Sequence, residues 1–173
     1  MKLIMISGDG QGAGKTFLAR KLTDNQTQIF SIVNIIRQEL QKKYSQYDWF
    51  NKEPEYKRLT MVEKTGKSIL QHLDELGRGK KKEDPLHWSK KMIEILKYAR
   101  DFEQHDTIVI DDIRFVDEYE HLKNALRSEN ILHIHVANQK AKPEPHYENE
   151  KLRLLADYII VSQKQLSSLT GVQ

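Results

Sequence analysis

The sequence predicts a three-layer α/β domain with a mostly parallel sheet of about five strands. Two observations support this fold class. Short apolar runs alternate with segments of helical periodicity along the whole chain, and two of these runs end in glycine or carboxylate residues. Such alternation is typical of a parallel sheet whose two faces are covered by helices. The length of 173 residues suits one domain, so we expect a single domain over residues 1–173.

The amino-terminal half begins with a strand, a glycine-rich loop and a helix. The apolar run 3–6 precedes a loop with four glycines, and residues 15–23 follow with helical spacing of apolar side chains. A second strand is expected over 29–33. The next two helices are expected through residues 35–44 and over 59–76, where apolar side chains share one face.

The carboxyl-terminal half continues the alternation. Asp84 and Pro85 provide an N-cap and a first-turn proline for a helix whose apolar side chains recur from Trp88 to Phe102. The run 107–110 is β-branched and ends in two carboxylates, which is typical of a buried parallel strand. The other expected elements are a loop holding the lysines at 80–82, helices over 115–127 and through 152–155, and strands over 131–136 and 158–161.

Composition narrows the class of protein. Hydrophobic residues make up 38% and charged residues 31%, which is compatible with a packed core and disfavours a disordered chain. The net charge of +3 does not demand a nucleic-acid partner. The absence of cysteine excludes disulfides and thiolate chemistry and is compatible with a reducing cytoplasm. Apolar runs reach only four or five residues, so we expect neither a signal peptide nor a membrane anchor.

The glycine-rich loop before Lys15 and Thr16 is the strongest local signal. Glycines let consecutive backbone N–H groups point into one cavity, where the start of the following helix adds positive potential for phosphate oxygens. A lysine and a hydroxyl at its end suit terminal phosphates and Mg²⁺. The residues expected to bind ATP are Gly10, Gln11, Gly12, Ala13, Gly14, Lys15 and Thr16.

The loop departs from the strict G-x-x-x-x-G-K-[ST] pattern. Asp9 stands where that pattern has its first glycine, and Gly8 lies one residue too early. An aspartate would repel a triphosphate unless its side chain points outward. A plain glycine-rich turn and a dinucleotide-binding loop are the alternatives. The dinucleotide loop fits less well, since no acidic residue ends a clear second strand at the ribose position.

A second part of the site follows the strand 107–110. Asp111 and Asp112 look like a Walker B ending, which brings a carboxylate beside bound Mg²⁺. The metal candidates are therefore Thr16, Asp111 and Asp112, with the roles of the two aspartates interchangeable at this stage. Arg114 would contact an anionic substrate there, or else form an ion pair with a neighbouring acid on the next helix. His133 and His135 share one face of a strand and are interpreted as packed rather than metal-bound.

Several segments together resemble one family. Residues 112–118 are similar to D-V-R-F-x-N-E, and residues 70–88 to L-Q-x-L-G-T-E-x-x-R…D-x-x-F-W. Residues 156–161 with 166–169 are similar to A-D-Y-x-I-x-N-x-G-x-L-x-x-L, and 30–37 matches faintly a segment with a basic residue. In order and spacing the chain resembles the bacteriophage-type deoxynucleoside monophosphate kinases of the P-loop nucleoside monophosphate kinase superfamily. Departures include Asp74-Glu75-Leu76 in place of G-T-E.

The resemblance implies a three-layer P-loop kinase fold with a helical insert or lid over about 34–103. It implies ATP-dependent, Mg²⁺-assisted phosphorylation of a (deoxy)nucleoside monophosphate to the diphosphate. The loop 140–146 would contact the donor base, and the lysines at 80–82 would line the lid. Trp88 is alternatively a core residue. The implied catalytic residues are Lys15, Arg78, Arg114 and Asp112, and the implied acceptor-binding residues are Arg37, Gln71, Trp88 and Arg114.

Two other functions stay open at this stage. The same fold could phosphorylate a modified DNA base or another small acceptor, although the near-neutral charge disfavours a large nucleic-acid footprint. Alternatively, the irregular loop could belong to a nucleotide-binding module without turnover. The expected partners are small-molecule nucleotides, with no membrane and with a homodimer left open. The expected location is the cytoplasm, that of the host if a bacteriophage encodes the protein.

Overall fold

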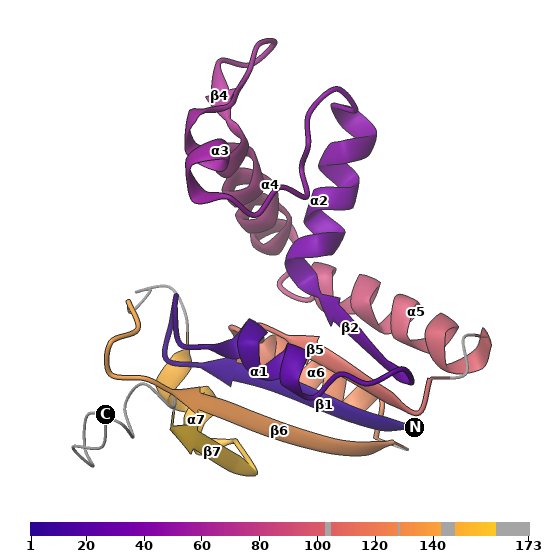
Figure 1. Cartoon of the computed structure of the whole chain (residues 1–173). Helices are drawn as coiled ribbons and strands as arrows, with labels where there is room; N and C mark the ends of the chain where they lie inside the picture. Colours follow the sequence, from indigo (N-terminus) through magenta and orange to yellow (C-terminus); the bar gives the residue numbers. More distant parts are fainter. Residues whose placement is uncertain (103–104, 128, 143–147, 162–173) are drawn as a thin grey trace. The chain divides into compact units, whose positions relative to one another are not determined.

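The computed structural model, which describes residues 1–102, 105–127, 129–142 and 148–161, contains a five-stranded sheet. Its strands lie in the order β2-β5-β1-β6-β7, and β1 pairs in parallel with both β5 and β6, as β6 does with β7 (Figure 1). The predicted α/β fold with a five-stranded parallel sheet flanked by helices is confirmed. The strands are β1 (Lys2–Gly8), β2 (Thr27–Ser31), β5 (Thr107–Asp111), β6 (Asn130–Ala137) and β7 (Tyr158–Val161).

The helices connect these strands. They are α1 (Lys15–Lys21), α2 (Ile32–Lys43), α3 (Pro54–Leu59), α4 (Ile69–Glu83), α5 (His87–Phe102), α6 (Val116–Ala125) and α7 (Asn149–Leu154). A short antiparallel hairpin joins β3 (Met61–Val62) to β4 (Lys67–Ser68). Within the described residues, none of the helices combines the length and apolar character that crossing a membrane requires.

The chain divides into two compact units. The sheet unit comprises Met1–Phe30 and Ile93–Gln173, and the helical unit comprises Ser31–Met92. The insert expected from the sequence, about 34–103, overlaps the helical unit over residues 34–92. The glycine-rich loop after β1 and the two aspartates at the end of β5, Asp111 and Asp112, belong to the sheet unit, so its internal geometry decides how they are arranged.

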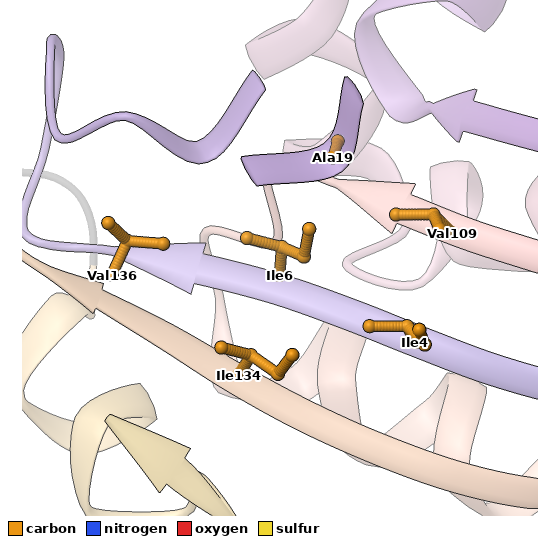
Figure 2. Close-up of a cluster of buried hydrophobic side chains, with 6 residues drawn as sticks. All are labelled: Ile4, Ile6, Ala19, Val109, Ile134 and Val136. Carbon is orange, nitrogen blue, oxygen red and sulfur yellow. The ribbon is translucent and has the colours of Figure 1, made fainter. Parts of the chain in front are cut away.

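One face of the sheet is aliphatic. Even-numbered residues of β1 point to this face, since successive side chains of a strand alternate between faces. They meet side chains of β5 and β6 and the buried Ala19 of α1 in a single cluster (Figure 2). This cluster fixes α1 against the sheet and so places the loop that precedes α1. Its buried members are Ile4, Ile6, Ala19, Val109, Ile134 and Val136.

The other face of the sheet changes character along β1. Leu3 and Met5 are buried apolar residues, but Ser7, the next residue on this face, is a fully buried hydroxyl. Its parallel neighbour across the strand pair is His135, and Met5 pairs with His133. Tyr119 of α6 packs its ring 4.6 Å from that of His133. A polar strip therefore lies buried between the sheet and its helices, close to where β1 ends.

The strand order explains why the loops meet. The chain passes from β1 toward the β2 edge and from β6 toward the β7 edge, so its direction changes at the centre of the sheet. Ligands of open parallel sheets bind outside the carboxyl ends of the strands at such a switch point. Here the glycine-rich loop follows β1, and the aspartates stand at the end of β5. Because these two strands are parallel neighbours, both groups lie at the carboxyl ends of the strands, on the same side of the sheet.

The predicted helix over Leu59–Leu76 is wrong. Helix α3 ends at Leu59, the β3–β4 hairpin follows, and α4 begins only at Ile69. Gly66 takes a positive φ of 64° in the hairpin turn, a conformation that breaks a helix. Ser68 then starts α4 with a capping box, in which its hydroxyl accepts from the Gln71 N–H and the Gln71 side chain accepts from the Ser68 N–H.

The lysines at 80–82 were expected in a loop, and this prediction is also wrong. They form the last turn of α4, where cations interact favourably with the exposed carbonyls and the helix dipole. Lys80 also pairs with Glu83 at 2.8 Å along the same turn. The helix expected from Pro85 begins two residues later, after a turn in which the Asp84 carboxylate accepts from the Leu86 N–H.

Candidate functional site

The loop after β1 has the backbone that a phosphate loop requires. Gly12 and Gly14 have φ values of 83° and 108°, which residues other than glycine rarely adopt. Gly14 is also the N-cap of α1. Gly8 is required for a different reason. A Cβ there would lie 2.9 Å from the Val136 carbonyl oxygen, so the start of the loop packs directly against β6.

Lys15 folds back over this loop. Its ammonium donates to the Gly10 carbonyl at 2.9 Å and lies 3.2 Å from Asp112 Oδ1. The side chain is mostly buried, so its charge is directed into the loop rather than into solvent. A cation held over a glycine-rich turn at the end of a parallel strand is the arrangement that binds terminal phosphates.

Thr16 faces the end of β5. Its hydroxyl lies 3.4 Å from Oδ2 of Asp111, a buried residue at the last position of that strand. A hydroxyl and a carboxylate are hard oxygen ligands, which Mg²⁺ prefers, and Mg²⁺ commonly takes only one or two of its ligands from protein. Thr16 and Asp111 therefore fit the predicted role of holding Mg²⁺. Asp111, which faces Thr16, differs in this respect from Asp112, which faces Lys15.

Asp112 connects the two predicted cations. Its φ of 70° places it in the left-handed region, and this turn directs its carboxylate toward Lys15 and Arg114. Arg114 donates from Nε to Oδ2 at 2.7 Å and contacts the same oxygen through Nη2. Burial would raise the pKa of Asp112, but the charges of Arg114 and Lys15 lower it overall, so the carboxylate is ionised.

Asp9 turns away from the loop interior. Its Oδ1 lies 2.8 Å from His135 Nε2, and its Oδ2 accepts from the Asn138 backbone N–H at 2.7 Å. Both partners belong to β6 or to the residue that follows it. The negative charge is thus held by β6 and does not occupy the loop, which removes the electrostatic objection raised by the sequence.

The segment after β6 also borders the loop. Gln11 and Lys142 exchange two backbone hydrogen bonds of 3.1 and 3.0 Å, and the Asn138 side chain donates to the Gly12 carbonyl at 3.2 Å. The predicted donor-base loop, 140–146, is described only for residues 140–142. Residues 143–146 of that prediction, and residues 166–169 of the family resemblance, lie outside the described residues.

The Asp9–His135 contact affects both pKa values. Burial would raise the pKa of Asp9, but the hydrogen bonds from His135 and from the Asn138 N–H outweigh burial and lower it. Burial lowers the pKa of His135 below its ordinary value, although Asp9 acts in the opposite direction. At neutral pH the pair is therefore a carboxylate beside a neutral imidazole.

Part of this arrangement was not predicted from the sequence. Ser7 and Asn138 were not singled out, and His133 and His135 were interpreted as packed residues. The available signal was the two-residue spacing: Ser7 on β1 and Asp9 just beyond the end of β1 are separated by the same interval as His133 and His135 on β6. The strand pairing that brings the two sets together could not be derived from that spacing alone.

Two predicted acceptor-binding residues of the helical unit form contacts inside that unit. Arg37 is only 7% exposed and donates from Nη1 to Asn34 Oδ1 at 3.0 Å. Burial together with the charges of Arg37 and Arg58 lowers the pKa of Lys57, so these three cations lie close enough to influence one another. The Gln71 side chain accepts from the Ser68 N–H at 2.8 Å as part of the α4 cap.

The two remaining predicted residues of this unit have ordinary structural contacts. Arg78 is exposed on α4 and donates from Nε to Asp74 at 2.6 Å, one helical turn away. Trp88 is 2% exposed, and its indole N–H donates to the Gly77 carbonyl at 2.9 Å. This environment fits the core interpretation of Trp88 rather than stacking on a base.

Over the described ranges, no group of three or more histidine, aspartate or glutamate side chains gathers as a metal site. Comparison of the chain with models of known protein families and with curated proteins finds no match.

Proposed function

We propose that the chain is an ATP-dependent kinase that phosphorylates a (deoxy)nucleoside monophosphate to the diphosphate. One observation carries the proposal: the two aspartates at the end of β5 lie beside Lys15 and Thr16, which follow the glycine-rich loop. Lys15 lies 3.2 Å from Asp112, and Thr16 lies 3.4 Å from Asp111. These are the cation, the hydroxyl and the carboxylates that phosphoryl transfer from a nucleoside triphosphate requires.

Each residue of the loop has a role under this proposal. Backbone N–H groups between Gly10 and Thr16 would bind the phosphates of ATP, and Lys15 would neutralise charge on its terminal phosphates. Thr16 and Asp111 would hold Mg²⁺ directly or through water. When bound, Mg²⁺ supplies charge neutralisation and alignment of the phosphate oxygens.

Arg114 brings a second cation to the edge of the site. Asp112 fixes its guanidinium at the carboxyl end of β5, and about a third of the side chain stays exposed. A planar guanidinium suits the phosphate oxygens of an acceptor or of the transferring group. Asp112 has a positioning role here, since it contacts both cations at once.

The acceptor is the part that rests most on the family resemblance. The helical unit adds one supporting observation: burial, and after it the charge of the nearby Arg37, lowers the pKa of Lys57, so these two cations lie close together. Cations that repel one another are stabilised by an anion between them, and a nucleoside monophosphate carries such a group. Arg37 would bind that phosphate, while Arg78 would have to leave Asp74 to reach a nucleotide.

The partners and location follow from the same proposal. The substrates are free nucleotides, so a nucleic-acid surface is not required, and the near-neutral charge agrees with this. A nucleotide kinase without cysteine suits a reducing cytoplasm, that of the host if a bacteriophage encodes it. A homodimer remains compatible with these expectations.

The experiment is an acceptor screen. The protein is mixed with ATP, Mg²⁺ and each common ribo- and deoxyribonucleoside monophosphate, and ADP formation is followed. The proposal expects ADP that depends on one or more monophosphates and disappears in Lys15→Met. A protein that binds ATP but forms no acceptor-dependent ADP contradicts it and is a binding module. Turnover only with hydroxymethylated DNA would instead assign the modified-base acceptor.

A further inference from the structure

A chain of buried polar side chains runs from the middle of the sheet unit to the glycine loop. His133 Nε2 lies 2.8 Å from Ser7 Oγ, which lies 2.9 Å from His135 Nδ1. His135 Nε2 in turn lies 2.8 Å from Asp9 Oδ1. Ser7, His133 and His135 are each 0% exposed. A buried polar group without a hydrogen-bond partner lowers the stability of the fold. The hydrogen bonds of this chain therefore require these side chains to keep their specific arrangement.

The direction of the hydrogen bonds follows from the end of the chain. The ionised Asp9 carboxylate can only accept, so His135 Nε2 carries a hydrogen and donates to it. With His135 neutral, Nδ1 must accept the Ser7 hydroxyl proton, and Ser7 then accepts from His133 Nε2. His133 Nδ1 is left without a hydrogen at 3.3 Å from the Leu155 carbonyl.

One added proton satisfies the whole chain. If His135 carries hydrogens on both nitrogens, Ser7 accepts from it and donates to His133, which then donates from Nδ1 to the Leu155 carbonyl. Donation from His135 Nε2 to Asp9 is present in both arrangements. This bond is therefore the constant element of the chain, whatever the proton count.

Other charges around the two imidazoles act in both directions. Arg153 of α7 and Lys15 of α1 oppose a positive charge on His135, and Asp9 favours it. For His133, the charge of Asp157 favours protonation while Lys123 of α6 opposes it. The Asp157 carboxylate also accepts from the His133 backbone N–H at 2.8 Å, which anchors the far end of the chain.

Asp9 is the place where this chain meets the phosphate loop. Its backbone N–H donates to the Val136 carbonyl, and its carboxylate spans His135 and the Asn138 N–H. Without the His135 donor, Asp9 Oδ1 would lose this partner, and it could regain one by turning toward the N–H groups of the loop. There it would compete with phosphate for the same donors.

We propose that His135 is a positioning residue for polyphosphate binding, which holds the Asp9 carboxylate on β6 and so keeps the loop N–H groups available to phosphate. The proposal rests on the proposed function in one respect, that the loop binds a polyphosphate. It goes further in assigning a role to a residue that touches no nucleotide.

The test compares the wild type with four single variants and with the Asp9→Ala/His135→Leu double variant. Calorimetric titration measures the binding of two probes, MgATP and inorganic tripolyphosphate. His135→Leu removes the donor, and His135→Gln restores a donor near the position of Nε2. Asp9→Ala removes the acceptor. Tyr119→Leu is the matched control, because Tyr119 is buried and packs against His133, at the opposite end of the polar chain from Asp9. Nitrogen-15 spectra of the histidines in the free protein report the tautomer of His135.

We expect His135→Leu to lower the affinity for both probes about tenfold or more. The affinities of His135→Gln should stay within about threefold of those of the wild type. Tyr119→Leu should lower thermal stability but leave both affinities within about twofold. The spectra should show Nε2 protonated in the free protein. Because Asp9→Ala removes the competing carboxylate, His135→Leu should have no further effect on affinity in that background.

Three binding results would overturn the inference while the proposed function stands. The first is wild-type affinity for both probes in His135→Leu, and the second is an equal loss of affinity in His135→Leu and His135→Gln. The third is a loss of affinity in Tyr119→Leu that accompanies its loss of thermal stability. A tautomer protonated on Nδ1 alone would also contradict it, whatever the probes do. If the wild-type protein binds neither probe, the proposed function itself fails, and the positioning role fails with it.

Discussion

The ammonium of Lys15 and the carboxylate of Asp112 lie 3.2 Å apart at the mouth of the glycine loop. Arg114 contacts the other oxygen of the same carboxylate. Asp112 therefore balances two cations that come from different elements, α1 and the turn after β5. A polyphosphate in the loop would compete with Asp112 for these two cations. Because Asp112 already holds Lys15 and Arg114 close together, both could contact the same anion.

Lys15→Met should abolish transfer while the fold is kept. Under the proposed function Lys15 neutralises charge on the transferring group, and loss of one such interaction costs on the order of 10²–10³ in kcat. Acceptor-dependent ADP formation measures the effect. Lys21→Met is the control, because Lys21 is an exposed lysine of the same helix. Equal activity of the Lys15 variant and the wild type would contradict the catalytic role.

Thr16 should determine the requirement for Mg²⁺. Thr16→Val removes the hydroxyl that faces Asp111, so the concentration of Mg²⁺ giving half-maximal rate should rise about tenfold, whereas Thr16→Ser should behave as the wild type. Initial rates at fixed ATP over a Mg²⁺ series provide the measurement. If the Val variant shows the wild-type Mg²⁺ dependence, Thr16 is not a metal ligand.

His133 should make the stability of the protein depend on pH. Burial lowers its pKa from 6.5 to about 4 in the folded protein. The unfolded chain therefore binds a proton more readily between these values, and the free energy of unfolding falls as the pH drops from 6.5 toward 4. A shift of this size corresponds to at most about 3 kcal/mol.

Urea unfolding of the wild type and of His133→Gln across this pH range tests the prediction. The variant should lose overall stability, because Gln cannot reproduce the ring packing against Tyr119. Its stability should nevertheless change less between pH 6.5 and 4 than that of the wild type. Parallel curves for the two proteins would show that His133 is not the titrating group.

Two glycines should respond in opposite directions to alanine. Gly8→Ala places a Cβ 2.9 Å from the Val136 carbonyl oxygen, a backbone atom that cannot move cheaply, so we expect a loss of about 1–3 kcal/mol. Gly79→Ala lies within α4, and a Cβ there meets nothing within 4 Å. Alanine is the better helix former, so the second change should stabilise by about 0.5–1 kcal/mol. Thermal unfolding of both variants gives the comparison, and destabilisation by Gly79→Ala would contradict it.

The secondary structure could be predicted from the sequence where the local residue pattern agrees with the fold. The sheet could be predicted because its apolar runs are short, β-branched and separated by helical segments. The sequence also indicated that Thr16 lies near the carboxylates at the end of β5, but it left Asp111 and Asp112 interchangeable, and the contact with Asp111 is seen only in the structure. Between Leu59 and Leu76, apolar spacing alone suggested one helix, and the turn conformation of Gly66 with the cap at Ser68 overrode it.

The buried chain beside the loop shows why other features could not be predicted. Asp9 looked unfavourable because its direction depends on partners more than 120 residues away, at His135 and Asn138. Spacing within one strand indicates a shared face but not which strand lies beside it. For Arg78 and Trp88, the family resemblance implied nucleotide contacts, whereas the structure pairs Arg78 with Asp74 and buries Trp88 with its indole N–H bonded to the Gly77 carbonyl.

The left-handed backbone at Asp112 limits which amino acids this position can accept. Aspartate, asparagine and glycine tolerate a φ of 70°, whereas β-branched residues are strained there. Natural variation and laboratory libraries alike should therefore be confined to a narrow set at this site, irrespective of charge. Asparagine separates the two constraints, since it preserves the turn while it releases both Lys15 and Arg114 from their shared counter-ion.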